Sequence, residues 1–392
     1  VLVSLPNFGD EQAIADTLRL SGLNVPILVQ AYPDDLGDLG VERRRDAYCG
    51  KISVCNNLRQ YGLPYSLTTL HTAHPTDAAF RADLVRFLGV CRVANGLRRA
   101  RIGAIGARPG AFKTVRYSEK LLEASGISVS TIDLSEVFGL ADRFAADDAR
   151  LAERIEAIRA YVPTAGVPGE SLGRMARLAL VIDDWMAEND LQASAVQCWN
   201  SVQANYGVSV CTLMSMMSER LMPSACEVDV AGAASMYALQ LAGGGPAALV
   251  DWNNNYGADP DKCILFHCGN WAASLAPGAR MAYPDILATT LGREGSYGAL
   301  AARVPAGPLG FARISTDDRA GRVRAYVGDG EFTDDPLDTF GSRAVVRVPR
   351  LQRLMRHICR EGFEHHVAMC AAPVAGILAE AFGTYLGWDV YH

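Results

Sequence analysis

The sequence lacks the features that mark several large classes of protein. No run of about 18 apolar residues occurs, so no transmembrane helix is predicted. The net charge of −6 argues against a nucleic-acid-binding protein, because such proteins are usually basic. The ten cysteines are scattered and form no Cys-x-x-Cys pair, which excludes the usual structural zinc sites. The chain opens at Val1 without a basic, apolar leader, and we therefore predict a cytoplasmic protein with reduced thiols.

Histidine is scarce, with seven residues in 392, yet two of the seven are adjacent. His365 and His366 lie in the stretch GFEHHVAM, directly after an acid and before an apolar run. Imidazole is a common metal ligand and a common acid–base group at neutral pH. The doublet is therefore a candidate part of a functional site.

The composition is that of a globular protein with a large core. Hydrophobic residues make up 49% of the chain and charged residues 20%, and the length corresponds to two or three domains. Residues 1–5 and 25–32 have the pattern of strands, and residues 10–22 that of a helix. A second unit repeats this order: a strand at 101–107, a helix at 115–126, and residues 127–138 as a strand entering a loop. Alternating strands and helices predict parallel sheets.

After residue 195 the pattern changes. Apolar runs at 194–203, 246–255 and 262–270 each end in polar residues, as strands do where ligands bind in open α/β sheets. Residues 283–350 form short, turn-separated segments typical of antiparallel strands. The predicted fold is α/β, with two N-terminal Rossmann-like domains, 1–97 and 98–195. A catalytic region, 196–392, follows and includes a small antiparallel β-barrel.

Acids and a histidine interrupt apolar runs in the catalytic region. Glu227, Asp251 and His267 lie at such positions, and a buried carboxylate is costly unless it is paired or binds a metal. Together with a late histidine they would give a mixed oxygen and nitrogen set suited to a divalent ion. Each has a simpler interpretation: Glu227 could cap a helix, Asp251 could open an Asx-turn, and His267 could be a core histidine.

Two further features have weaker support. Cys198 could be a nucleophile, but no base for it is evident in the sequence, and a buried thiol is the commoner interpretation. The run ERRR at 42–45 could meet an anionic substrate, although a short basic run is usually a solvated face.

Several stretches in order resemble the L-fucose/L-arabinose isomerase superfamily, more closely its fucose-isomerase side. They are QCWNSVQANYGVSVCTLMSMM, PSACEVDVAGAASMYAL, LVDWNNNYG, FHCGN, GEFTDDPLDTFG and GFEHHVAM. The resemblance implies a metal-dependent aldose–ketose isomerase that acts through a cis-enediol(ate). Manganese is the implied ion, with magnesium or cobalt as alternatives. Glu227 and Asp251 resemble the two metal-binding carboxylates, which also serve as acid and base.

The resemblance also assigns the histidines. His366 is favoured over His365 as the C-terminal metal ligand, and His267 resembles a metal or substrate position. In a strand the ring of His365 would point away from that of His366 and support the site from the other side.

The resemblance further implies a substrate and an assembly. Gln197, Trp199 and Asn253 resemble substrate-contacting positions. The substrate would be an L-fucose-like, L-arabinose-like or 6-substituted monosaccharide such as sulfoquinovose, and an anionic substituent would need a basic pocket, from the ERRR run or from Arg108. A homo-oligomer, trimer or hexamer, is expected. The alternatives are a metal-dependent epimerase or lyase and a non-catalytic sugar-binding protein of periplasmic type.

Overall fold

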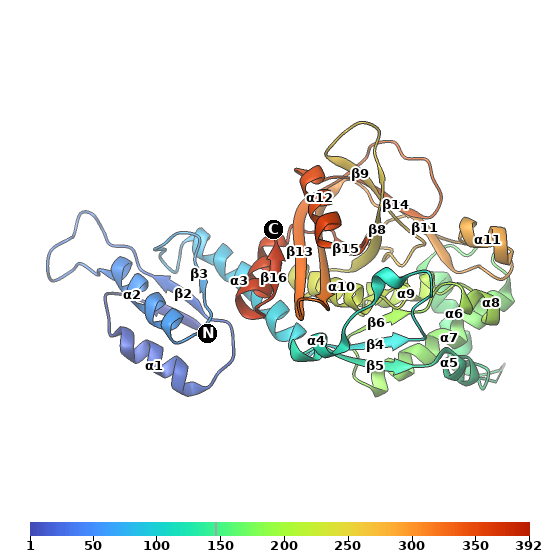
Figure 1. The fold of residues 1–392 in the computed structure, drawn as a ribbon, viewed down its shortest axis with the longest axis horizontal. Helices are drawn as coiled ribbons and strands as arrows, with labels where there is room; N and C mark the ends of the chain where they lie inside the picture. The colour runs from blue at the N-terminus through green and yellow to red at the C-terminus, as the bar shows by residue number, and fades with distance from the viewer. Residues whose placement is uncertain (146) are drawn as a thin grey trace. The chain divides into compact units, whose positions relative to one another are not determined.

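The structure, a computed structural model, describes residues 1–145 and 147–392. The chain divides into two compact units (Figure 1). The first contains Val1–Gly96 and Gly376–Val390, and the second contains Leu97–Ala375 and Tyr391–His392. The division of the sequence into 1–97, 98–195 and 196–392 stays a prediction, because compactness does not show which parts fold independently.

The first unit is built on a parallel sheet in the order β1-β2-β3. Helix α1 begins after Asp10, whose carboxylate accepts from the backbone N–H groups of Gln12 and Ala13, and ends at Gly22 in the left-handed region. The elements of this unit are β1 (Leu2–Leu5), α1 (Glu11–Ser21), β2 (Leu28–Ala31), α2 (Ala47–Gln60), β3 (Ser66–Leu67), α3 (Ala78–Leu97), α13 (Ala375–Glu380) and the π-helical turn η2 (Ala381–Tyr385).

The second unit begins with a parallel sheet in the order β5-β4-β6-β7. Its strands are β4 (Arg101–Ile105), β5 (Ser128–Ile132), β6 (Ala193–Val196) and β7 (Ser224–Ala225). The expected loop after β5 is wrong, because helix α5 (Leu134–Ala141) begins there. Asp133 explains the difference: its carboxylate accepts from the backbone N–H of Ser135 and caps the helix.

The other helices of the second unit connect and cover its sheets (Figure 1). They are α4 (Glu119–Ala124), α6 (Ala149–Tyr161), α7 (Gly169–Glu188), α8 (Ser201–Tyr206), α9 (Cys211–Glu219), α10 (Val230–Gly243), α11 (Asp285–Leu291), α12 (Leu351–Glu361) and the 3-10 turn η1 (Lys113–Val115). Among the described residues, every helix is too short or too polar to cross a lipid bilayer.

A large mixed sheet completes the second unit. Its strand order within this unit is β10-β11-β14-β9-β8-β15-β12-β13. The last strand of the chain, β16 (Asp389–Tyr391), spans the boundary at which the chain passes from the first unit to the second. The strands of the sheet within this unit are β8 (Ala247–Asn255), β9 (Lys262–His267), β10 (Arg280–Ala282), β11 (Ala299–Arg303), β12 (Gly307–Asp317), β13 (Arg322–Thr333), β14 (Ser342–Arg347) and β15 (His366–Cys370).

The predicted mixed α/β architecture with parallel sheets is confirmed, and the antiparallel strands expected at 283–350 include β12, β13 and β14. β13 pairs antiparallel with both β12 and β14. These strands belong to the large sheet, and the small barrel stays a prediction.

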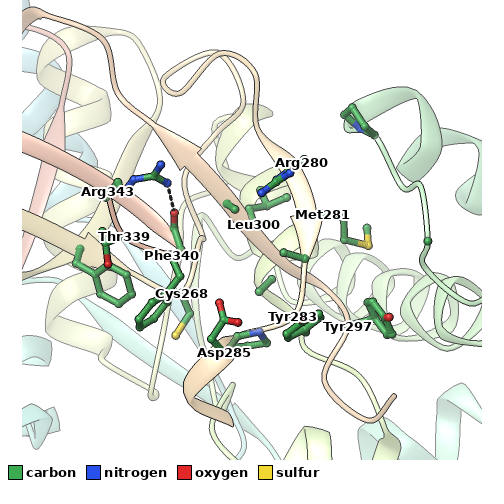
Figure 2. Close-up of a pocket in the computed structure, with 18 of the residues that line it drawn as sticks. Cys268, Arg280, Met281, Tyr283, Asp285, Tyr297, Leu300, Thr339, Phe340 and Arg343 are labelled. Atoms are coloured by element: carbon green, nitrogen blue, oxygen red, sulfur yellow. Dashed lines mark hydrogen bonds between the residues drawn. The ribbon is translucent and has the colours of Figure 1, made fainter. Parts of the chain in front are cut away.

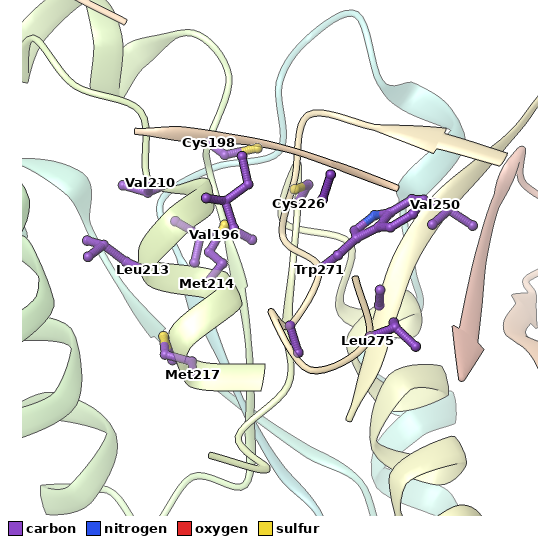
Figure 3. Close-up of a cluster of buried hydrophobic side chains, with 14 of the residues drawn as sticks. Val196, Cys198, Val210, Leu213, Met214, Met217, Cys226, Val250, Trp271 and Leu275 are labelled. Atoms are coloured by element: carbon purple, nitrogen blue, oxygen red, sulfur yellow. The ribbon is translucent and has the colours of Figure 1, made fainter. Parts of the chain in front are cut away.

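The two sheets of the second unit meet at helix α10. This helix contacts β4, β6 and β7 of the parallel sheet and β8, β12 and β15 of the mixed sheet. Figure 3 shows part of the buried apolar cluster beside this junction, where the side chains of Val196, Cys198, Cys226, Val250 and Trp271 pack together. Because the strands of the β5-β4-β6-β7 sheet are parallel, the carboxyl ends of β4, β6 and β7 lie at one edge of that sheet.

Candidate metal centre

Glu227 lies in the tight connection between β7 and α10. Its φ is 54° and that of Val228 is 56°, so two consecutive residues with side chains adopt the left-handed region, which is rare away from functional sites. The carboxylate is buried. The Cys198 thiol, just after β6, lies 3.4 Å from Glu227 Oε1 and donates to it, and the same sulfur accepts from the Glu227 N–H. This turn and this thiol fix the position of the Glu227 carboxylate.

Asp251 and His366 come together through strand pairing. β8 and β15 are antiparallel, and their register places His366 directly opposite Asp251. Directly opposite residues project from the same face of a sheet, with their Cβ atoms about 5 Å apart. One residue pair of the β8–β15 ladder therefore brings together two positions that are 115 residues apart in the sequence.

The carboxylates of Glu227 and Asp251 both lie close to the imidazole of His366. His366 Nε2 lies 3.7 Å from Glu227 Oε2 and 3.5 Å from Asp251 Oδ1. Both oxygens are buried and have no hydrogen-bond partner among the residues that the structure describes. Two groups of possible metal ligands share His366, one with Glu227 and His267 and one with Asp251 and His365, and within each group the ligand atoms lie within 4.8 Å of one another. The donors of each group suit a divalent ion, which would satisfy a carboxylate oxygen that is otherwise costly to bury.

A second layer of polar groups fixes the orientation of His366. Its Nδ1 lies 2.8 Å from Asp229 Oδ2, so Nδ1 carries the proton and Nε2 keeps a free lone pair. Arg313 donates to both oxygens of Asp229, and its Nε donates to Glu364 Oε2 at 3.0 Å. Ser315 donates to the other oxygen of Glu364. The buried charges of this second layer are thus paired, as a stable interior requires.

The charges around the centre shift the pKa values of its carboxylates. Burial alone would raise the pKa of Glu227, but the imidazoles of His267 and His366 and the Cys198 thiol outweigh burial and lower it. Burial likewise opposes ionisation of Asp229, and the charge of Arg313 together with the bond from His366 holds its pKa well below the usual value. Both carboxylates are therefore ionised at neutral pH.

His267 and His365 flank the three converging groups. His267 is buried at the end of β9, and its Nε2 lies 3.6 Å from Glu227 Oε2. Burial disfavours its protonation, but the nearby Glu227 carboxylate outweighs burial and raises the pKa of His267 to about 9. His365 is 43% exposed, and its Nε2 lies 3.6 Å from Asp251 Oδ1.

The expectation that the two adjacent rings point apart is wrong. The ring centroids of His365 and His366 are 4.5 Å apart. The alternation of side chains applies only within a strand, and β15 begins at His366, so His365 lies outside it.

The predicted substrate-contacting residues lie in different surroundings. Trp199 is half-buried and meets the ring of Phe112 edge-to-face at 5.1 Å. Gln197 accepts a hydrogen bond from the backbone N–H of Ala107. Asn253 is exposed, its amide oxygen accepts a hydrogen bond from the Asn254 side chain, and it forms no hydrogen bond with the centre among the described residues.

Sequence reasoning missed several residues of the site. Asp229, two residues after Glu227 in the same apolar run, was given no role, although the cost of burying its carboxylate was a usable signal. Arg313 and Glu364 gave no such signal, because charged residues in amphipathic strands and turns usually face solvent. Phe112, whose ring centroid lies 6.3 Å from that of His366, was also missed.

A cavity of about 600 Å³ lies next to the end of β9 (Figure 2). Cys268, the residue after His267, forms part of its wall. Burial and the negative charge of Glu227 raise the pKa of the Cys268 thiol, which is therefore protonated. Tyr283 and Tyr297 meet edge-to-face at 5.8 Å in the same wall.

Known proteins resemble this chain over most of its length. The family model described as "Fucose/sulfoquinovose isomerase, N-terminal domain" matches residues 1–98, and that described as "L-fucose isomerase, C-terminal domain" matches residues 265–392. His267, His365 and His366 lie in the second match.

Three curated relatives are named sulfoquinovose isomerase. The protein of Alkalicoccus urumqiensis is 26% identical over 360 residues, which is 91% of this chain and 78% of the relative. That of Priestia aryabhattai is 24% identical over 382 residues, 97% of this chain and 82% of the relative. That of Clostridium sp. (strain MSTE9) is 26% identical over 375 residues, which is 90% of this chain and 78% of the relative. The chain therefore belongs to the fucose/sulfoquinovose isomerase family and, as the sequence predicted, is an enzyme of the aldose–ketose isomerase type.

Proposed function

We propose that this enzyme interconverts a 6-sulfonated aldose, with sulfoquinovose as the first candidate, and the corresponding ketose. The observation that carries the proposal is the closeness of His366 Nε2 to both Glu227 Oε2 and Asp251 Oδ1, with both oxygens unpartnered among the described residues. The relatives named sulfoquinovose isomerase support the choice of sugar.

Glu227, Asp251 and His366 would hold the metal ion. Two carboxylate oxygens and one imidazole nitrogen suit manganese, which we propose as the ion, with magnesium or cobalt as alternatives. When bound, a divalent ion supplies Lewis-acid stabilisation of negative charge on sugar oxygens. Asp229 keeps the proton of His366 on Nδ1 and so presents Nε2 to the ion.

The two carboxylates also suit the proton transfers of the reaction. One of them takes the proton from C2 of the open-chain aldose while the other, in its acid form, gives a proton to O1, which yields a cis-enediol. The first then returns its proton to C1 while the second recovers a proton from O2, which yields the ketose and restores both groups. Each of Glu227 and Asp251 has a second carboxylate oxygen besides the one facing His366, so binding and proton transfer use different atoms.

The surroundings of the centre favour this chemistry. Glu227 is 5% exposed and His366 1% exposed, so little water reaches them and electrostatic interactions are strengthened. The aromatic rings of Phe112 and Trp199 provide apolar surface beside the histidines. Trp199 is proposed to contact the sugar, with Asn253, His267 and His365 as further polar contacts.

The test is product analysis in deuterated water with the manganese-loaded full-length protein and sulfoquinovose. NMR is expected to show the ketose with deuterium at C1, and EDTA is expected to stop the reaction. A new aldose would indicate an epimerase, and shorter carbon fragments would indicate a lyase. Asp251→Asn is expected to abolish turnover, whereas Asp259→Asn, on the exposed turn between β8 and β9, is the matched control. If manganese, magnesium and cobalt all fail to support ketose formation, the proposal is refuted.

Three proposals about the whole molecule accompany this function. The enzyme is proposed to act in the cytoplasm, consistent with its ten cysteines, all of them described and all free. It is proposed to assemble as a trimer or hexamer, which sedimentation analysis would test. The strands β14, β9, β8, β15, β12 and β13 are proposed to close into the small barrel, because each has two antiparallel neighbours in that set.

A further inference from the structure

The segment that follows β4 carries positive charge without any acid. Residues 106–117, here named the basic segment, read GARPGAFKTVRY and contain Arg108, Lys113 and Arg116. The next acid along the chain is Glu119. The basic segment leaves the same sheet edge from which Glu227 emerges, because β4, β6 and β7 are parallel.

The basic segment is held firmly at its ends and in its middle. Gln197 accepts from the Ala107 N–H at 2.8 Å, and the Ser118 N–H donates to Thr316 Oγ1 at 2.9 Å. Val115 is fully buried. A Cβ at Gly106, where φ is +84°, would lie 2.6 Å from the Gln197 amide oxygen, so this junction requires glycine. The segment thus has a defined position relative to the metal centre.

Phe112 fixes that position next to the histidines. Its ring centroid lies 6.1 Å from that of His365 and 6.3 Å from that of His366. The backbone N–H of Phe112 donates to the carbonyl of Pro109, which closes a turn between Arg108 and Lys113. Arg108 and Lys113 are therefore next to the turn that contains Phe112, whose ring lies beside the two histidines.

The cations of the basic segment are not neutralised by acids. The hydrogen bonds of Arg108 and Arg116 go to the backbone carbonyls of Pro109 and Lys113, and none of the segment's three cations forms an ion pair with a carboxylate in the described part of the chain. A bond to a carbonyl leaves the positive charge available to an anion.

The ERRR run differs in this respect. Arg43 pairs with Asp38 at 3.1 Å, and Arg44 pairs with Asp46 at 2.6 Å. The side chain of Arg45 donates to the carbonyl of Pro6 and lies over the ring of Tyr32. Most of the charge in this run is already compensated, which leaves the basic segment as the stronger candidate.

The cavity beside Cys268 is also a weaker candidate for binding an anion (Figure 2). Arg280 and Arg343 line it, but Asp285 and Asp338 line it as well, so its charges balance.

The metal centre offers no surplus positive charge to an anionic sugar. Glu227, Asp229, Asp251 and Glu364 are gathered there, with Arg313 as the buried cation that pairs with two of them. A bound divalent ion would offset much of the remaining negative charge, so a sulfonate needs cations from elsewhere in the site.

We propose that the basic segment binds a tetrahedral oxyanion on the end of the sugar remote from C1, with Arg108 and Lys113 as the specificity-determining cations. This inference rests on the proposed isomerase function and names the residues that select its charged substrates. A sulfonate and a phosphate share this chemistry, and substrates carrying each group distinguish them.

The test compares three aldoses with the manganese-loaded full-length enzyme: sulfoquinovose, glucose 6-phosphate and the neutral 6-deoxyglucose. The double variant Arg108→Gln/Lys113→Gln is expected to lower kcat/KM for the preferred anionic sugar by about 10–100-fold, mainly through KM, because charge-assisted hydrogen bonds are lost. Its kcat/KM for 6-deoxyglucose is expected to stay within about twofold, as for other surface changes. The wild-type KM for the anionic sugar is expected to rise with salt concentration, whereas the wild-type KM for 6-deoxyglucose is expected to stay constant.

Two control variants isolate the basic segment. Lys120→Gln removes a nearby cation that is already paired with Glu123, and Arg280→Gln removes one from the cavity beside Cys268. Both are expected to behave like the wild type. The inference is overturned if the double variant keeps the wild-type preference for the anionic sugar, if Arg280→Gln loses it instead, or if the wild type prefers the neutral sugar.

Binding separates the inference from the proposed function. If the wild type isomerises none of the three sugars, the function fails, and calorimetry of sulfoquinovose with the manganese-loaded wild type and double variant decides the inference. Weaker binding to the double variant supports it, and equal binding overturns it.

Discussion

Replacement of Asp229 by asparagine tests whether the second layer of polar groups controls the metal centre. The side chain is fully buried and accepts from His366 Nδ1 at 2.8 Å, from Arg313 and from the N–H of Gly232. Asparagine has the same shape, and its oxygen is expected to take the place of Oδ1, which accepts from both Gly232 N–H and Arg313 Nη2. The amide N–H₂ group then takes the place of Oδ2 and faces His366 and Arg313 Nη1. His366 Nδ1 would then accept a hydrogen bond, and the ring proton would move to Nε2, where it blocks metal binding.

The magnitudes follow from these contacts. Loss of a correctly oriented imidazole is expected to lower manganese affinity by about 10–100-fold. Loss of the charge-assisted bonds to Arg313 is expected to lower the free energy of unfolding by about 1.5–3 kcal/mol. Calorimetric titration of the metal-free protein with manganese measures the first effect, and urea unfolding of the metal-free protein measures the second.

Glu364→Gln is the matched control. It removes a charge from the other side of Arg313 but does not touch His366, as Glu364 bonds Arg313 and Ser315. Its stability is expected to fall by a similar amount while its manganese affinity stays near that of the wild type. The reasoning is refuted if Asp229→Asn binds manganese as the wild type does, or if Glu364→Gln loses as much affinity.

Three further predictions follow from other contacts. His366→Gln is expected to remove measurable manganese binding, whereas His365→Gln, at a ring that is 43% exposed and lies 3.6 Å from Asp251 Oδ1, should lose less than about tenfold. The same titration compares the two variants, and equal losses would contradict the assignment. Gly232→Ala is expected to destabilise the protein by about 1–3 kcal/mol, because its Cβ would lie 2.6 Å from the carboxylate that caps α10; an unchanged urea midpoint would disprove this. Burial lowers the pKa of Lys51 in the folded protein, so the unfolded chain binds this proton more tightly. The free energy of unfolding, measured relative to Lys51→Met, is therefore expected to rise with pH between the folded pKa and about 10.4. Urea midpoints of the two proteins between pH 7 and 10.5 measure this difference in stability, and a difference that falls with pH would contradict the prediction.

Local patterns in the sequence predicted much of the fold. Apolar residues recur every two residues in a half-buried strand and about every 3.6 residues in a half-buried helix. This local pattern was enough to predict β12, β13 and β14 from residues 307–349. The polar ends of apolar runs likewise indicated Glu227, Asp251 and the histidine doublet. The helix after β5 was missed, because its capping residue, Asp133, also suits a loop.

The polar network behind the metal centre was beyond the reach of local patterns. Asp229 is 84 residues from Arg313 and 137 residues from His366, and Arg313 is 51 residues from Glu364. Nothing near Arg313 in the sequence distinguishes it from a solvated arginine on an amphipathic strand. Its burial is decided by the packing of α10 against β12 and β15.

The sequence by itself determined the strands and helices and the chemical types of the groups at the centre, because these depend on residues close together along the chain. Only the tertiary structure decided which groups converge, which way each imidazole faces and which cations remain unneutralised. Strand register sets His366 opposite Asp251, and the parallel order of β4, β6 and β7 brings the basic segment and Glu227 to one edge. Such contacts join segments that are distant in the sequence, so they stabilise the protein only after both sheets have packed together.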